Sequence, residues 1–402
     1  MDRKRRRFRV LLVAETYFPH EGGSERVGHN AALALTQAGY DVSVLTPDRP
    51  GSAEFDRDQP YRVRRSRLWS WLKRLDERGG NASRIGRILT ALYLSITAGL
   101  ARWNALIVLH LVPMAVPLKL LSRLSSRPRL VWIYQEELTV ARGSAAMRRQ
   151  AAWALFGSTR IVAISERTRE IAVEFGIPAE RIFLQYPVPD SVFFDPLPDG
   201  RPELREGFNA TPDKLLFSTV TRMAERKGVD TVLHALAALK DERGSDPPVV
   251  YTIAGTGPEE ERLKRLAGDL RLDSLVRFLG RISEEEKVAL IEASDLFLMP
   301  NRRLPNGEDE GFGIVFVEAA LRGTPCIGGR SGGTASALEH GTSGWLVDGS
   351  DAGELTERLR EVLARPAVLS EMRPGCREWA LRKFQPHREH EPLLKELERL
   401  LA

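Results

Sequence analysis

Cysteine is scarce in this sequence, whose 402 residues include only Cys326 and Cys376. Two isolated thiols indicate neither a disulfide framework nor a cysteine-based zinc site, and such usage is typical of a reducing, intracellular compartment. We therefore expect a cytoplasmic protein. The length suffices for two domains of about 200 residues each. A content of 43% hydrophobic and 28% charged residues is ordinary for globular proteins.

Long apolar runs are missing as well. The most apolar region, residues 88–122, is interrupted by Arg102, Lys119 and two prolines. We expect no transmembrane helix, because such a helix needs about 20 consecutive apolar residues. The opening MDRKRRRFR carries six cations and one acid, but the apolar core of a signal peptide does not follow it. We therefore expect no signal peptide.

Short apolar segments alternate with amphipathic helical segments, a pattern that predicts parallel sheets covered on both faces. The proline- and acid-rich PVPDSVFFDPLPDG, near 187–200, interrupts this alternation once. We predict an α/β chain of two facing, Rossmann-like, doubly wound domains at 1–195 and 200–383. A cleft between them is expected at the carboxyl ends of the strands. The last helix, at about 384–402, is expected to pack back onto the first domain. The predicted strands are 8–15, 41–46, 61–66, 105–110, 129–134, 159–164, 215–220, 249–255, 276–280, 295–300, 324–329 and 344–347.

The G-x-G-x-x-G fingerprint of dinucleotide-binding proteins is also absent. In AGTGPEE, Gly255 and Gly257 are followed by Glu260 where the third glycine belongs. The loop after the first strand does not supply the fingerprint either. This argues against a nicotinamide-dependent dehydrogenase.

What the sequence does contain is a set of glycines and cations in the loops that follow strands. Gly22 and Gly23 precede the first helix, where glycine allows close backbone approach and free N–H groups favour an anion. Arg222 and Lys227, in TRMAERKG, follow a strand and suit a diphosphate. Two glycines in such a loop are more often structural, and the two cations alone are equally compatible with a solvated charged loop.

The most informative stretch is EDEGFGIVFVEAALRGTPCIGG, residues 308–329. It predicts a loop that leads into a buried helix, with Glu310 just before the helix and Glu318 about one turn inside it. A carboxylate near a helix N-terminus gains from the helix dipole, so both should be ionised hydrogen-bond acceptors. The alternative is a capping acid and a solvated helical glutamate, although the apolar neighbours of Glu318 argue against solvation.

EGFGIVFVEAALRGTPCI resembles the E-x7-E signature of family 4, the retaining nucleotide-sugar glycosyltransferases with the GT-B fold. Further segments resemble the family's N-terminal glycine loop, its R-x4-K-G motif and three others. The resemblance covers nearly the whole chain. It implies transfer of a hexose-type sugar from a UDP- or GDP-type sugar nucleotide to an acceptor hydroxyl, with retention at the anomeric carbon. The further segments are YFPHEGGSERV, RMAERKGVD, IAGTGPEEERL, VRFLGRIS and HGTSGWLVD.

The resemblance also implies roles for individual residues. Arg222 and Lys227 would neutralise the donor diphosphate, Glu318 would accept from the ribose hydroxyls and Glu310 from the donor sugar. Glu310, Arg222 and Lys227 are thus the expected catalytic residues. No metal or other cofactor is expected, because cations and helix ends would do that work. The only D-x-D, at residues 56–58, lacks the strand context of a metal site. The other donor-binding residues implied are Gly22, Gly23, Arg277, Leu279, Arg281, Phe312, Gly313 and Ile314.

The sequence departs from the family pattern in WIYQEEL, where members often carry a histidine near the reacting sugar. Gln135 at that position can orient a hydroxyl but cannot act as a base, whereas Glu136 could. His110, at another strand end, is a further acceptor-side candidate, although a lone histidine there is more often structural. The departure leaves two alternatives to a transferase open. These are another GT-B sugar enzyme, such as an epimerase or phosphorylase, and a non-catalytic sugar-nucleotide binding protein.

The acceptor is less clearly indicated. YRVRRSRLWSWLKR, residues 61–74, has six cations, two tryptophans and no acid. Together with the basic N-terminal arm it favours contact with an anionic membrane surface, as a peripheral protein on the cytoplasmic face. A solvated loop is the main alternative. Nucleic acid is not expected, because no nucleic-acid-binding motif accompanies these residues. Candidate acceptors are a lipid-linked sugar, a cell-envelope glycan or a small molecule.

Overall fold

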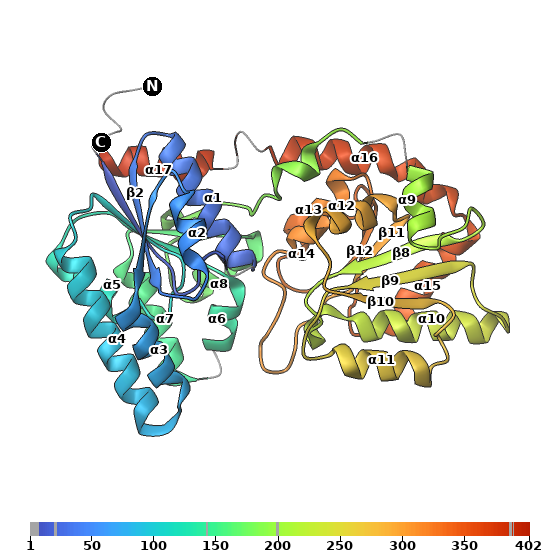
Figure 1. Cartoon of the computed structure of the whole chain (residues 1–402), viewed down its shortest axis with the longest axis horizontal. Coiled ribbons are helices and arrows are strands. Elements are labelled where there is room, and N and C mark those ends of the chain that lie inside the picture. Colours follow the sequence, from blue (N-terminus) through green and yellow to red (C-terminus); the bar gives the residue numbers. More distant parts are fainter. Residues whose placement is uncertain (1–7, 20–21, 142–143, 198–200, 386–387, 389) are drawn as a thin grey trace. The chain divides into compact units, whose positions relative to one another are not determined.

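The computed structural model describes residues 8–19, 22–141, 144–197, 201–385, 388 and 390–402. The chain divides into two compact units. The first unit is Met1–Pro187 with His387–Ala402, and the second unit is Val188–Pro386. Each unit is built on one parallel sheet, and helices cover both faces of that sheet (Figure 1). The predicted α/β class with two doubly wound parallel sheets is confirmed.

The first unit has a seven-stranded sheet in the order β3-β2-β1-β4-β5-β6-β7. Its central strands are apolar on both faces, as the cover of helices requires, and every residue of β4 and β5 is buried. The order reverses between β1 and β4, so the loops after these two strands meet at a switch point, where ligands of such sheets bind. The strands are β1 Arg9–Val13, β2 Asp41–Pro47, β3 Arg62–Ser66, β4 Ala105–Val108, β5 Arg129–Ile133, β6 Arg160–Ala163 and β7 Ile182–Leu184.

Helices of the first unit begin at recognisable signals, and three of them start with a serine whose hydroxyl accepts from a backbone N–H of the first turn. The last helix, α17, belongs to this unit, where Glu396 pairs with Arg160 and the side chains of Leu393 and Leu397 are buried. The short strand β7 was not predicted, because three residues carry too little periodicity. The helices are α1 Gly23–Gln37, α2 Ser52–Arg57, α3 Arg67–Glu77, α4 Gly80–Leu100, α5 Ala115–Leu124, α6 Gln135–Ala141, α7 Ala145–Gly157, α8 Glu166–Glu174, η2 Ala179–Arg181 and α17 Glu391–Leu401.

The second unit has a six-stranded sheet in the order β10-β9-β8-β11-β12-β13. It begins within the proline- and acid-rich segment near 187–200, which contains the turn η3 Ser191–Phe194 with Phe193 fully buried. Its strands are β8 Leu215–Val220, β9 Val249–Ala254, β10 Val276–Gly280, β11 Leu296–Met299, β12 Cys326–Gly329 and β13 Gly344–Val347. Its helices are α9 Arg201–Gly207, η4 Glu225–Lys227, α10 Val229–Arg243, α11 Glu260–Asp269, α12 Glu284–Ala293, α13 Ile314–Leu321, α14 Thr334–Ala337, α15 Ala352–Ala364 and α16 Ala367–Lys383.

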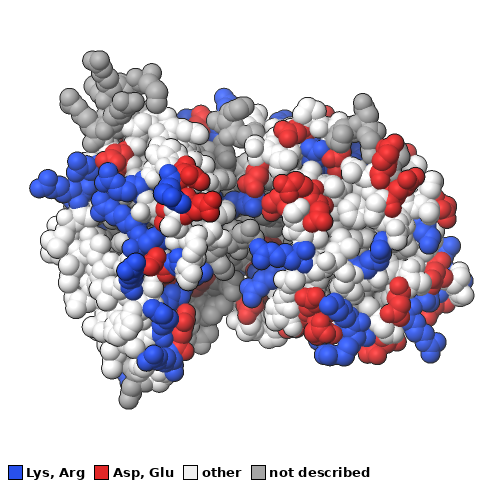
Figure 2. Space-filling view, viewed as in Figure 1, with Lys and Arg blue, Asp and Glu red and all other residues white. Residues whose placement is uncertain are grey.

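Charge is distributed unequally between the units. The Lys, Arg, Asp and Glu residues give +12 for the first unit and −7 for the second, which together make the +5 of the whole chain. On the face shown in Figure 2, Lys and Arg side chains gather on the first unit over the region of β3 and α3. None of the helices in the described ranges is both long and apolar enough to cross a membrane.

The basic segment 61–74 is only partly available for binding. Trp71 is 49% exposed, but Trp69 is 1% exposed and belongs to the core, so only one of the two tryptophans is available for the expected membrane contact. Arg65 is half-buried and pairs with Asp56 at 2.8 Å, and Lys73 pairs with Glu15 at 2.9 Å. The exposed cations of the segment are Arg62, Arg64, Arg67 and Arg74. The basic arm before residue 8 lies outside the described residues.

Candidate active site

The loop after β11 leads into α13 through a tight turn at Gly313. This residue has φ +83°, and a Cβ there would lie 2.6 Å from the Phe316 ring, so only glycine fits. Gly313 has no side chain to cap the helix, so the first N–H groups of α13 are available to a ligand. Glu318 is 3% exposed, which rules out a solvated helical glutamate.

Glu310, just before this turn, forms an ion pair with Lys227 from η4. Burial opposes ionisation of Glu310, but the charge and hydrogen bond of Lys227 outweigh burial and lower its pKa. The backbone carbonyl of Glu310 accepts from the Gly333 N–H at 2.7 Å, and a Cβ on Gly332 would clash with that carbonyl. Two of the three predicted catalytic residues therefore meet in a rigid arrangement. The third, Arg222, is exposed on the same loop as Lys227.

Glu318 has a cation of its own, which the sequence did not indicate. Lys287 of α12 donates to Glu318 at 3.1 Å and pairs with Glu284 at 2.8 Å. Its ammonium also lies 4.9 Å from the centre of the Phe193 ring. Burial alone would lower the pKa of Lys287, but Glu318 and Glu284 more than compensate and raise it. Both glutamates of the E-x7-E motif are thus paired with a largely buried lysine.

The loops that follow β8, β9 and β10 pack against one another. The Gly255 N–H donates to the Gly280 carbonyl at 2.6 Å, and a Cβ on Gly255 would clash with the Thr221 carbonyl. This brings Leu279 and Arg281, which flank Gly280, to the loop that carries Arg222. Arg277 lies lower on β10 and donates to the Phe208 carbonyl at 3.4 Å, away from this loop cluster. Of the three predicted donor-binding residues on β10 and the loop after it, Leu279 and Arg281 lie in the cluster.

The glycine loop of the first unit behaves differently from the expectation. Gly22 is packed so closely against Glu25 that a Cβ would clash with the carboxylate, whereas a Cβ on Gly23 would meet open space. Glu25 is buried, and the hydroxyls of Thr16 and Ser24 with its own N–H outweigh burial and lower its pKa. A carboxylate therefore already lies at the start of α1, where the sequence suggested a place for phosphate.

His110 and Gln135 follow adjacent strands β4 and β5 but differ in their hydrogen bonding. His110 Nδ1 accepts from the Glu15 N–H at 3.1 Å, so Nε2 carries the proton and donates to the Thr16 hydroxyl at 3.2 Å. Burial lowers the pKa of His110, which keeps the ring neutral. Gln135 is 1% exposed, and neither of its amide atoms has a partner among the described residues. The side chain of Glu136 lies outside the described part of the structure.

Metal-ligand chemistry receives no positive indication. Within the described ranges, no three His, Cys, Asp or Glu side chains are grouped as metal ligands. Asp56, the first residue of the only D-x-D, belongs to α2 and is paired with Arg65 of β3.

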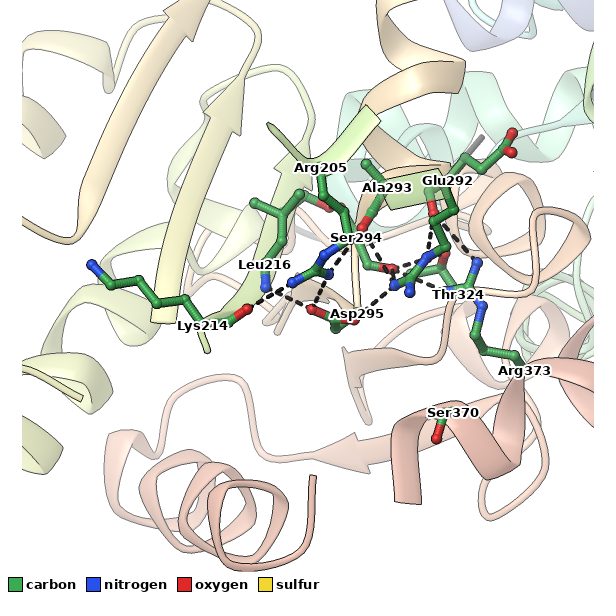
Figure 3. Close-up of polar contacts among 12 residues, drawn as sticks. Arg205, Lys214, Leu216, Glu292, Ala293, Ser294, Asp295, Thr324, Ser370 and Arg373 are labelled. Atoms are coloured by element: carbon green, nitrogen blue, oxygen red, sulfur yellow. Dashed lines mark hydrogen bonds and ion pairs between the residues drawn. The ribbon is translucent and has the colours of Figure 1, made fainter. Parts of the chain in front are cut away.

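A network of buried charges holds the C-terminal ends of α12 and α13. Arg322, after the end of α13, pairs with Glu292 of α12 at 3.0 Å, and both residues are 3% exposed. Next to them, Asp295 pairs with Arg205 (Figure 3). Asp295 also binds Arg201 at 2.7 Å. Arg373 donates to the Ser294 carbonyl at 3.0 Å. These bonds fix the helices that carry Lys287 and Glu318 to the sheet.

Comparisons with known proteins agree with this arrangement. The model of "Glycosyltransferase Family 4" matches residues 21–190, and that of "Glycosyl transferases group 1" matches residues 200–379. The GDP-mannose-dependent alpha-(1-6)-phosphatidylinositol monomannoside mannosyltransferase of Mycolicibacterium smegmatis is 32% identical over 386 residues, which cover 94% of each chain. The D-inositol 3-phosphate glycosyltransferase of Streptomyces bingchenggensis is 30% identical over 220 residues, 52% of this chain and 46% of the relative.

Two solved structures show the same fold at low sequence identity. Anabaena Alr3699/HepE in complex with UDP has a TM-score of 0.77 and 17% identity, covering 97% of this chain and 100% of its own. Sucrose-phosphate synthase from Thermosynechococcus elongatus has a TM-score of 0.76 and 19% identity, covering 98% and 100%.

Fold and site together define a glycosyltransferase with the GT-B fold. The chain belongs to glycosyltransferase family 4, as its motifs suggested. It is an enzyme that moves a hexose-type sugar from a nucleoside-diphosphate sugar to an acceptor hydroxyl, and the relatives named above are all sugar transferases. This outcome decides against the non-catalytic binding protein and against an epimerase or phosphorylase.

Proposed function

We propose that this enzyme transfers mannose from GDP-mannose to a hydroxyl of a phosphatidylinositol-linked mannoside, with retention and without a metal ion. The carrying observation is the similarity to the mannosyltransferase of M. smegmatis, which extends over 94% of both chains. The site described above supplies the groups that such a donor needs.

The donor diphosphate binds between Lys227, Arg222 and the free N–H groups at the start of α13. Lys227 keeps Glu310 ionised through their ion pair, and its ammonium has further N–H donors for a phosphate oxygen. Gly313 and Ile314 supply the backbone donors, as expected for an anion at a helix N-terminus. The Phe312 N–H already donates to the Glu310 carboxylate and helps to hold it in place. The cations and amides take the place of a metal ion in stabilising the leaving diphosphate.

The two glutamates bind hydroxyl groups on either side of the diphosphate. Glu318 accepts from the ribose hydroxyls and Glu310 from the sugar, each as an ionised carboxylate held by a lysine. Leu279 and Arg281 contact the base through the loop cluster that contains Gly280.

In the transfer step, the bond from the anomeric carbon to the diphosphate oxygen breaks, and the acceptor oxygen bonds to that carbon on the same face. The acceptor proton passes to an oxygen of the leaving diphosphate, so no protein base is required. Gln135, a buried amide with unpaired atoms, orients a sugar hydroxyl, which satisfies the hydrogen-bonding need of a buried amide. Neutral His110 holds the loop after β1 and takes no part as a base.

The acceptor lipid brings the enzyme to the cytoplasmic face of an anionic membrane as a peripheral protein. The exposed cations Arg62, Arg64, Arg67 and Arg74 support this part of the proposal, because each cation near such a surface contributes about 1 kcal/mol.

The direct test supplies purified enzyme with phosphatidylinositol monomannoside in mixed micelles and compares GDP-mannose, UDP-glucose and ADP-glucose. We expect a mannosylated lipid from GDP-mannose, an α-linkage by NMR and unchanged turnover in EDTA. Transfer from another donor alone would overturn the choice of substrate. A β-linkage would exclude retention, and loss of turnover in EDTA would exclude the metal-free route.

A further inference from the structure

Helix α4 exposes an apolar stripe along its whole length. The residues at positions 85, 89, 92, 96 and 100 recur at helical spacing, so they share one face with residue 88. The solvent-facing side of a surface helix normally carries polar residues, and an exposed apolar patch of this extent marks an interaction site. The stripe consists of Ile85 (52% exposed), Ile88 (68%), Leu89 (37%), Leu92 (55%), Ile96 (51%) and Leu100 (81%).

The stripe is part of a larger apolar surface formed with α3 and α5, which both pack against α4. Gly86 allows α3 and α4 to approach closely, because a Cβ there would lie 2.8 Å from the Asp76 backbone nitrogen. Leu68 and Trp71 of α3 are 50% and 49% exposed, and Leu124 of α5 is 80% exposed. In Figure 2 the surface over α4 is largely free of the colours that mark charged side chains.

Cations surround this surface. From Arg78 to Gln135 the sequence has no Asp or Glu, while Arg84, Arg102 and Arg123 are exposed along this stretch. Beside α3, a groove of about 500 Å³ is lined by Arg49, Arg67, Lys73 and Arg74, together with Asp48 and Glu77. An apolar helix face bordered by cations is the composition of helices that lie in the interface of an anionic bilayer.

This charge pattern also indicates what occupies the surface. A second copy of the chain would bring the same cations against one another, and like charges across an interface cost affinity. An anionic bilayer instead offers hydrocarbon to the stripe and phosphate groups to the cations. The arrangement fits a membrane surface and opposes self-association.

We propose that the hairpin of α3 and α4 is the membrane-docking element, in which the α4 stripe enters the acyl boundary of an anionic bilayer. The cationic groove beside α3 takes lipid phosphate groups. This inference deepens the peripheral association proposed above and rests on it. It assigns the main contact to α4, whereas the sequence had suggested the basic segment 61–74 together with the basic N-terminal arm.

The test measures binding to sedimenting vesicles of phosphatidylcholine with and without phosphatidylglycerol. The stripe variant carries Ile88→Gln, Leu92→Gln and Ile96→Gln. The control carries Met147→Gln, Phe156→Gln and Val173→Gln, which are apolar residues of the same unit with exposures of 39–54%, against 51–68% for the three stripe residues. We expect wild type and control to bind the anionic vesicles and the stripe variant to bind at least tenfold more weakly. Thermal unfolding and hydrolysis of the sugar nucleotide in solution should be the same in all three.

The outcomes separate the inference from the proposal beneath it. If wild type binds neither vesicle, peripheral association itself is wrong. If wild type and stripe variant bind equally, the assignment to α4 is wrong. If the stripe variant alone changes the oligomeric state in solution, the surface is a self-association face.

A second measurement reports insertion directly. Cys326 and Cys376 are both buried, so Leu92→Cys can be labelled selectively with an environment-sensitive fluorophore, and Phe156→Cys serves as the control. Anionic vesicles should shift the emission of the Leu92→Cys label to the blue and leave the control label unchanged. An unshifted Leu92→Cys label on bound protein would overturn the inference.

Discussion

The two units of this enzyme share a doubly wound parallel sheet and use it in opposite ways. Fourteen of the eighteen large apolar side chains exposed among the described residues belong to the first unit. The second unit holds the most deeply buried charge pairs, among them Lys227 with Glu310 and Arg322 with Glu292. The first unit thus offers a surface, whereas the second holds a preorganised site.

This difference has a physical basis. A donor with fixed chemistry is bound best by groups that need no reorganisation, and buried pairs provide such groups. A lipid-linked acceptor lies at a bilayer, so contact with it depends on exposed apolar area and cations rather than on rigid geometry.

The largest effect is expected from Glu292→Ala, which tests whether buried charge pairs stabilise the second unit. The change leaves the Arg322 guanidinium buried without its carboxylate, and loss of one partner of a buried pair costs about 3–5 kcal/mol. Hydrogen exchange measured at increasing urea concentration should show the lower free energy of unfolding in peptides of the second unit. The matched control, Glu242→Ala, removes an exposed partner of Arg360 and should cost less than about 1 kcal/mol. An equal cost in both variants would contradict a special role for buried pairs.

Lys227→Ala tests catalysis at the donor site. Removing this charge leaves the leaving diphosphate less stabilised, and kcat/KM should fall about 10²-fold or more. Lys73→Ala in the first unit removes a lysine that is also paired with a glutamate, but it should leave turnover of a soluble acceptor near wild type. Unchanged kcat/KM in Lys227→Ala would remove this residue from the catalytic site.

Acid should separate the stabilities of the two units. Burial lowers the pKa of His390 from 6.5 to about 4 and also lowers the pKa of His110, both in the first unit. Below about pH 6.5 these histidines are protonated in the unfolded chain but remain neutral in the folded unit. The free energy of unfolding of the first unit therefore falls by about 1.4 kcal/mol per pH unit for each such histidine. The depressed carboxyl pKa of Glu310 acts in the second unit, where stability is lost only below about pH 4.

Hydrogen exchange between pH 7 and pH 5 measures this separation. Peptides of the first unit should lose protection first, and His390→Leu should flatten the pH dependence of that unit alone. A simultaneous loss in both units would contradict the assignment.

The smallest expected effect concerns Lys287→Met. Loss of its bond to Glu318 should let the carboxylate move, and KM for the donor should rise about fivefold, near 1 kcal/mol, the scale of one hydrogen bond. In the proposed role of Glu318 the bond supports ribose binding, so kcat should change little. Lys264→Met, which breaks an exposed pair with Glu260, is the matched control. A fall in kcat without a change in KM would place Lys287 in catalysis rather than in positioning.

Much of the fold was legible in local pattern. Apolar strand segments and helical periodicity predicted two parallel sheets, and only β7 was missed, since its three residues carry almost no pattern. The turn at Gly313 and the two motif glutamates were also indicated locally, because a glycine-rich loop before an apolar helix has few other interpretations. The sequence did not show that Trp69 is buried while Trp71 is exposed. Both residues lie on α3, and the residue type alone does not tell which face of the helix is buried.

The partners of these residues were not legible in the same way. Lys287 lies 31 positions from Glu318, in the acid-rich first turn of α12. A capping box already accounts for the residues of this turn, so nothing in the sequence indicated a contact with Glu318. The contact of the Glu25 carboxylate with Gly22 was not expected, because it depends on the rotation of the Glu25 side chain.

The sequence by itself determined the class of fold, the family and the motif residues, since short-range pattern and spacing carry that information. Tertiary structure alone decided which cation pairs with which glutamate, which tryptophan is buried and that one face of α4 remains uncovered. Burial and pairing are properties of segments brought together in space, so local pattern cannot specify them.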